Sequence, residues 1–153
     1  MRHVALVLIV LAISLLAGCS GSSDRQAEAL TGPHQGTLVK LPDGRGYAEI
    51  LDLGKERSSS RGDAPSQVAV YFLAADGKGS ATGSASGVAV ELTIVTGRPA
   101  KVVPLESSPD AADPAGKARF LSKPGVYRLS ESTGDLVASL DGQAIKVPFD
   151  GVR

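Results

Sequence analysis

The chain has 153 residues, a length that is sufficient for one domain with a hydrophobic core of its own. Its 16 basic and 16 acidic side chains balance, so no excess of positive charge points to nucleic acid as a partner. The 18 glycines and 9 prolines, set among short Val-rich runs, favour strands and turns over helices.

The first 18 residues have the pattern of a secretion signal. Arg2 gives a positive start, and an apolar run from Val4 to Leu16 is interrupted only by Ser14. This run is too short to span a bilayer comfortably, which is typical of a signal peptide that is removed. We therefore expect residues 1–18 to be cleaved.

The segment after this run, Leu16-Ala17-Gly18-Cys19, resembles the lipobox of bacterial lipoproteins, in which small residues precede a cysteine that receives diacylglycerol. The resemblance implies acyl chains on the sulfur and on the new amino group of Cys19. Cys19 is the only cysteine of the chain, and a lone thiol in a secreted protein otherwise needs explaining. The alternatives are an ordinary secretory signal and an uncleaved anchor helix.

Such an anchor would fix the location of the protein. Each buried methylene contributes about 0.8 kcal/mol, so several acyl chains make attachment to a membrane effectively permanent. We expect the chain at the cell membrane or outer membrane, with its domain on the periplasmic or extracellular side. In lipoproteins of two-membrane bacteria an Asp often follows the cysteine and retains the protein at the inner membrane. Ser20 stands there instead and favours the outer membrane.

Residues 19–33 are polar beyond the cysteine and lack a core pattern, so we expect a lipidated Cys19 and a flexible tether. The folded domain is expected over 34–153. Short apolar segments recur there behind turn signals, as in all-β proteins. The expected strands are 37–41, 47–53, 68–73, 88–94, 101–105, 118–122 and 126–129, followed by a hairpin. Residues 78–87 are Gly, Ser, Ala and Thr with one Lys, and are expected to be mobile.

Two of these segments allow a sharper prediction. Residues 68–73 are apolar on both alternating faces, which indicates a central strand covered on each side. Asp141-Gly142 is a two-residue hairpin signal, so Leu140 should face Gln143, Ala138 should face Ile145, and opposed residue numbers should sum to 283. Pro148 lacks an N–H and predicts that the last strand lies at an edge.

These strands predict a small antiparallel immunoglobulin-like β-sandwich, with a small β-barrel as the alternative. The chain also resembles a group of small bacterial secreted proteins and lipoproteins whose domain opens with a His-Gly-Gly segment. The residues that carry the resemblance are His34-Gln35-Gly36-Thr37-Leu38-Val39, Gly46-Tyr47-Ala48-Glu49, Val70-Tyr71-Phe72-Leu73, Asp76-Gly77, Asp113-Pro114-Ala115-Gly116-Lys117-Ala118-Arg119-Phe120 and Asp141-Gly142-Gln143. Gln35 departs from the second position of the opening segment. The resemblance implies an architecture over 34–149 and no particular activity.

The expected domain has few residues that could act in catalysis or bind a metal. His34 is its one histidine, which argues against a His-rich zinc or copper site and against a nucleophile with a histidine base. His34 could join Asp43 or Glu49 in a weak metal site, and the 106–116 loop could ligate calcium without an EF-hand pattern. We expect no enzyme and no cofactor besides the covalent lipid.

The favoured hypothesis is therefore a lipid-anchored, non-enzymatic binding or structural module of the cell envelope, whose partner is a protein or a small ligand. The alternative is a periplasmic metal-handling accessory protein that uses His34. A hydrolase is the third possibility.

Overall fold

A computed structural model describes residues 31–54, 65–94, 101–127 and 129–152. The expected signal, the lipobox residues with Cys19, and most of the tether lie outside these ranges. Within them no helix is long and apolar enough to cross a bilayer.

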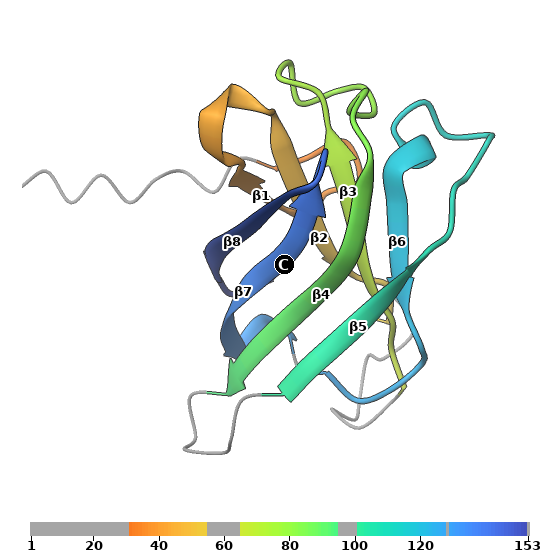
Figure 1. Ribbon diagram of the computed structural model, residues 1–153. Coiled ribbons are helices and arrows are strands. Elements are labelled where there is room, and N and C mark those ends of the chain that lie inside the picture. The colour runs from red at the N-terminus through yellow and green to blue at the C-terminus, as the bar shows by residue number, and fades with distance from the viewer. Residues whose placement is uncertain (1–30, 55–64, 95–100, 128, 153) are drawn as a thin grey trace, which may run out of the picture.

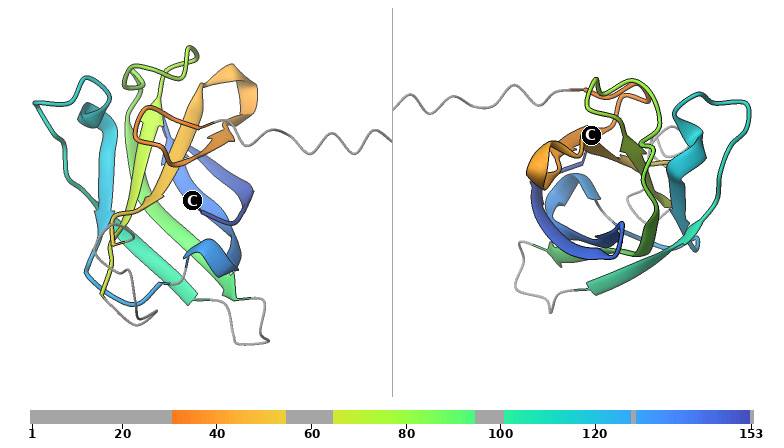
Figure 2. Two further views of the ribbon diagram at one scale, coloured as in Figure 1. Left: turned by 180° about the vertical axis from the view of Figure 1, so that it is seen from behind. Right: turned by 45° about the horizontal axis from the view of Figure 1, so that its top comes forward.

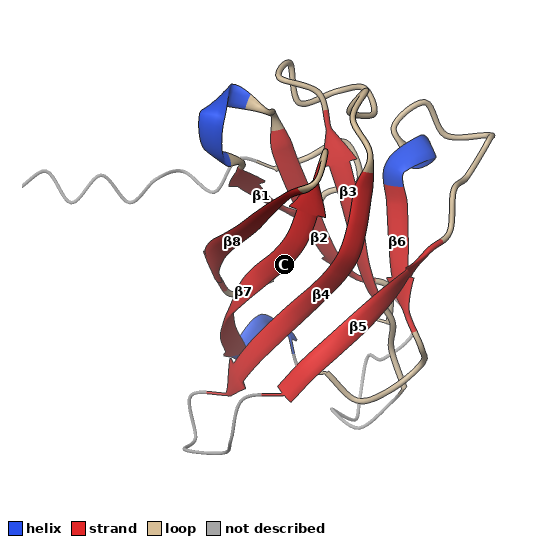
Figure 3. Cartoon of the chain, in the orientation of Figure 1, coloured by secondary structure: helices blue, strands red, loops and turns tan. Residues whose placement is uncertain are grey.

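The described part of the chain is an antiparallel all-β fold, as predicted (Figures 1 and 3). Its strands are β1 (Thr37–Lys40), β2 (Tyr47–Asp52), β3 (Val68–Leu73), β4 (Ala85–Ile94), β5 (Lys101–Ser107), β6 (Arg119–Ser122), β7 (Ser132–Leu140) and β8 (Gln143–Asp150). The eight strands form one sheet in the order β1-β2-β3-β6-β5-β4-β7-β8.

This sheet curls until its two end strands meet, so the alternative arrangement, a small barrel, describes its shape (Figure 2). β1 and β8 come together at a seam, where the Thr37 hydroxyl donates a hydrogen bond to the Gly151 carbonyl at 3.2 Å. Inward side chains from all eight strands fill the interior, among them Val88, Val90 and Leu92, as the alternation of β4 predicts.

The β7–β8 hairpin has the predicted register in full. Leu140 pairs with Gln143, Ala138 with Ile145 and Leu136 with Val147. β8 is also the last strand of the sheet, so Pro148 stands in an edge strand as expected. Turn chemistry and hydrophobic alternation point to the same pairing, and a one-residue slip would turn the buried Ile145 toward water.

The expected strand at 126–129 is wrong. β5 and β4 lie between β6 and β7 in the sheet, so the chain from β6 to β7 has to cross one end of the barrel. This crossing ends in a short 3-10 helix, η4 (Leu129–Glu131), and it buries Tyr127 and Leu129 in the core while Val126 is exposed. Two of the apolar residues that suggested a strand, Tyr127 and Leu129, therefore close one end of the barrel.

The segment 78–87, expected to be mobile, is tied to its surroundings. Its last three residues already belong to β4. Ser80 forms an isolated bridge with Leu73 and donates a hydrogen bond from its hydroxyl to the Ala115 carbonyl at 2.7 Å. The small side chains of this segment border one end of the barrel without filling it.

Candidate functional site

β3 is buried on both faces, as its sequence predicts, because the barrel has a second apolar layer outside the sheet. This outer cluster consists of Leu51, Ala69, Tyr71, Leu73 and Ala115, with Leu38, Tyr47 and Leu121 packed against it. Ala115 comes from the loop between β5 and β6, which lies over the outside of the sheet. The outer cluster is where the only histidine of the described residues is found.

His34 lies flat against the outer cluster. Its ring stacks on that of Tyr71, with centroids 3.9 Å apart and an interplanar angle of 19°. Its two ring nitrogens each meet a carboxylate: Nδ1 lies 2.7 Å from Glu49 Oε2, and Nε2 lies 2.7 Å from Asp113 Oδ2. A neutral imidazole has a single N–H, so each ring nitrogen donates or accepts according to its tautomer.

Glu49 is fully buried, with 0% of its surface exposed. Its Oε1 accepts hydrogen bonds from the backbone N–H groups of His34 (2.9 Å) and Gly36 (2.8 Å), while Oε2 faces the His34 ring. A Cβ on Gly32 would overlap this carboxylate, so the turn formed by residues 31–36 can close over Glu49 only with glycine there. A buried charge is tolerated when it is paired and hydrogen-bonded in this way.

Asp113 brings in the loop between β5 and β6. Its Oδ1 accepts the backbone N–H of Ala115 at 2.9 Å, and its Oδ2 faces His34. Burial raises the pKa of the Asp113 carboxyl, but the hydrogen bonds from Ala115 and His34 outweigh this effect and hold the pKa below its ordinary value. His34 thus links the amino-terminal turn to the loop between β5 and β6, although it lies 79 positions from Asp113 in the sequence.

This arrangement bears on the two metal sites considered from the sequence. Glu49 does contact His34, whereas the second carboxylate is Asp113 and Asp43 lies in the turn after β1. Across the described ranges no three His, Cys, Asp or Glu side chains are grouped so that they could hold a metal ion. A metal at His34 would have to displace a carboxylate from a ring nitrogen, and metal handling through His34 stays a prediction. In the 106–116 loop, Asp110 pairs with Arg119 at 3.2 Å.

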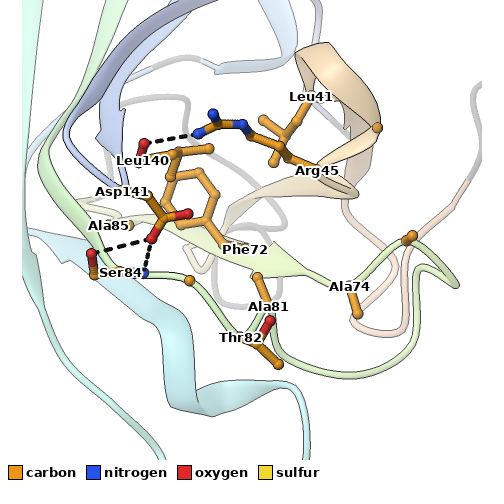
Figure 4. A pocket seen from close by; sticks show the side chains of 13 residues that line it. Leu41, Arg45, Phe72, Ala74, Ala81, Thr82, Ser84, Ala85, Leu140 and Asp141 are labelled. Atoms are coloured by element: carbon orange, nitrogen blue, oxygen red, sulfur yellow. Dashed lines mark hydrogen bonds between the residues drawn. The ribbon is translucent and has the colours of Figure 1, made fainter.

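A different place in the fold offers room for a ligand. A pocket of about 290 Å³ opens at the end of the barrel where the β1–β2 and β7–β8 turns lie (Figure 4). Its walls are mainly apolar and include Leu41, Phe72, Ala81 and Leu140. His34, Glu49 and Asp113 do not line it. Ligand pockets commonly lie in the mouths of β-barrels, with an apolar lining and a few fixed polar groups.

Arg45 stands at the rim within the turn that joins β1 to β2. Asp43, Gly44 and Gly46 all have positive φ, and a Cβ on Gly46 would overlap the Leu73 carbonyl oxygen. The Arg45 guanidinium reaches from this turn to the β7–β8 hairpin, where it donates to the Leu140 carbonyl at 2.8 Å and to the side-chain oxygen of Gln143.

Asp141, the first residue of the hairpin turn, also stands at the rim. Its Oδ1 accepts the Ser84 backbone N–H at 2.8 Å and the Ser84 hydroxyl at 3.4 Å. In Figure 4 the guanidinium of Arg45 lies above the Phe72 ring, and the carboxylate of Asp141 is drawn across that ring. The sequence predicted Asp141 as a turn residue only. A signal for the pocket was present in the small side chains of 81–85, which leave the mouth of the barrel unfilled.

No protein-family model, no curated protein and no solved structure matches this chain.

We predict that Glu49→Ala lowers the free energy of unfolding by about 3 to 5 kcal/mol, because it leaves the amino-terminal turn and His34 without their buried partner. Glu91→Ala is the matched control, since Glu91 pairs with Lys146 at 2.7 Å on the surface and should cost less than about 1 kcal/mol. Urea unfolding of the purified variants measures both. Equal losses would show that burial gives Glu49 no special role.

We predict that Asp113→Asn is less stable than the native protein at neutral pH, by about 1 to 3 kcal/mol, and that this gap closes in acid. Because folding lowers the Asp113 pKa, its contribution is complete above the ordinary value of 3.8 and is lost as the pH falls through the folded value. Urea unfolding of both proteins between about pH 7 and pH 2.5 tests this. A gap that does not change with pH contradicts it.

Proposed function

We propose that this chain is a lipid-anchored module of the bacterial cell envelope that binds a small, mainly apolar ligand at the open end of its barrel and catalyses no reaction. The observation that carries the binding role is the pocket of about 290 Å³, with Phe72 and Leu140 in its wall and two charged groups at its rim. Its volume lies at the lower end of the range for ligand pockets, so the ligand is small.

The non-enzymatic role is supported by the position of the one histidine in the described residues. His34 has both ring nitrogens occupied by carboxylates and lies on the outer cluster instead of in the pocket. A general base must be within hydrogen-bond reach of the group it deprotonates, and a ligand in the pocket would not meet His34.

The anchoring role is supported by the lipobox-like segment that ends at Cys19. The amino-terminal turn that covers Glu49 begins at Thr31, twelve residues beyond Cys19. Twelve extended residues span at most about 40 Å, so a lipidated Cys19 would keep the barrel close to a membrane surface.

We predict that the native protein, extracted from membranes, begins at Cys19 and carries acyl chains there. Intact-mass spectrometry measures this directly. Cys19→Ser should move the protein to the soluble fraction because it has no thiol to accept diacylglycerol, whereas Ser20→Ala should stay with the membrane. An unmodified sulfur, or a chain that still begins at Met1, would overturn the anchoring role.

We predict that Ala81→Leu weakens the binding of cyclohexanol, a small apolar probe, at least about tenfold, since the larger side chain fills the pocket. Methyl NMR titration of the mature chain carrying Cys19→Ser gives the affinity and shows whether Leu41 and Leu140 sense the probe. Ala111→Leu makes the same change at an exposed position outside the pocket and should bind as the native sequence does. Equal binding by both variants would remove the pocket from the proposal.

A further inference from the structure

The rim of the pocket carries one cation and one anion that are fixed in position but not paired with each other. Arg45 is held by Leu140 and Gln143 of the β7–β8 hairpin, and Asp141 is held by Ser84. Among the ion pairs of the described residues, none joins Arg45 to Asp141, although both line the same pocket. Two opposite charges at the mouth of one apolar pocket are complementary to a ligand that itself has two charges.

Arg45 has donors to spare. A guanidinium has five N–H groups, and Leu140 and Gln143 take one each. The hydrogen bonds of the described residues leave the others available, and a guanidinium matches the two oxygens of a carboxylate. Because the hairpin already orders the side chain, little further rotamer entropy is lost when an anion binds.

Asp141 has an acceptor to spare. Ser84 occupies Oδ1, while Oδ2 has no donor among the described residues. A Cβ on Gly83 would lie 2.7 Å from Oδ2, so glycine leaves the approach to this oxygen open. An ammonium group, with three N–H donors, suits a carboxylate oxygen placed in this way.

The apolar wall lies beside these two charges, with Phe72 and Leu140 near both of them in Figure 4. We propose that the pocket binds a small zwitterion with an apolar body, an α-amino acid with an aliphatic or aromatic side chain. Its carboxylate meets Arg45, its ammonium group meets Asp141, and its side chain packs against Phe72 and Leu140. This inference rests on the proposed binding role of the pocket and names the class of ligand.

Calorimetric titration of the full chain in detergent micelles, with empty micelles as the blank, tests this with four probes that share the isobutyl group of leucine. Leucine has both charges, N-acetyl-leucine only the negative one, leucinamide only the positive one, and 3-methyl-1-butanol neither. Leucine should bind at least about tenfold more tightly than each of the others, because only leucine engages both rim groups.

Two conservative variants assign the charges. Arg45→Gln should weaken leucine and N-acetyl-leucine and leave leucinamide unchanged. Asp141→Asn should weaken leucine and leucinamide and leave N-acetyl-leucine unchanged, while Asn still suits the positive φ of 51° and can accept the Ser84 N–H. Lys123→Gln and Asp150→Asn make the same charge changes at exposed positions outside the pocket and should have no effect.

The outcomes separate this inference from the proposed function. Equal binding of leucine and N-acetyl-leucine means an anionic ligand class and overturns the inference, as does equal binding of all four probes. If cyclohexanol binds and leucine does not, the apolar pocket stands and the zwitterion is excluded. If neither binds, both proposals fail. The comparison of four probes uses the native sequence, so it decides the matter even if a rim variant fails to fold.

Discussion

The buried carboxylate of Glu49 is the constraint on which the outer layer of this barrel depends. β3 has apolar side chains on both faces, and a strand of this kind needs a cover on the outside of the sheet as well as a core within. The cover consists of two irregular segments with little secondary structure of their own. Glu49 binds the amino-terminal turn at residues 31–36, and His34 of this turn contacts Asp113 in the loop between β5 and β6. Polar contacts therefore hold both segments over the apolar outer cluster.

The open end of the barrel follows a different principle. Its turns are tight, with positive φ at Gly44, Gly46 and Asp141, and the segment that borders them is built from small side chains. Tight turns and small residues leave the core unfilled at the end of the barrel where the β1–β2 and β7–β8 turns lie. At the other end, Tyr127 and Leu129 close the barrel from the crossing that leads into β7. The two ends of the barrel are therefore unlike, and the described pocket with charged groups around an apolar wall lies at the end with the tight turns.

The sequence was informative where two local signals agreed. Asp141-Gly142 set the turn and the alternation of Leu136, Ala138 and Leu140 set the face, so the register of β7 and β8 could be predicted residue by residue. The segment at 126–129 had apolar residues but no turn that fixed a partner strand, and it closes one end of the barrel instead of forming a strand. A local sequence pattern indicates which side chains are buried, but it does not indicate which other segments of the chain cover them.

The two regions of chemical interest were harder to predict for physical reasons. His34 and Glu49 are separated by 15 positions and were considered together, but Asp113 lies 79 positions from His34 in a loop whose path depends on the whole sheet. The pocket is produced by missing side-chain volume, and a run of Gly, Ser and Ala gives no sign of what surrounds it. Asp141 was visible in the sequence only as a member of a turn, and no sequence pattern singled out Arg45.

Around the barrel, each pair of neighbouring described strands is joined by backbone hydrogen bonds, except at the seam between β1 and β8. The Thr37 hydroxyl and the Gly151 carbonyl form a hydrogen bond at this seam. Arg45 links the two sides of this seam at the pocket end, because it projects from the β1–β2 turn and donates a hydrogen bond to the Leu140 carbonyl beside the β7–β8 turn. The same guanidinium faces the pocket. A ligand held by the Arg45 guanidinium would therefore share this side chain with the contact that joins the two turns.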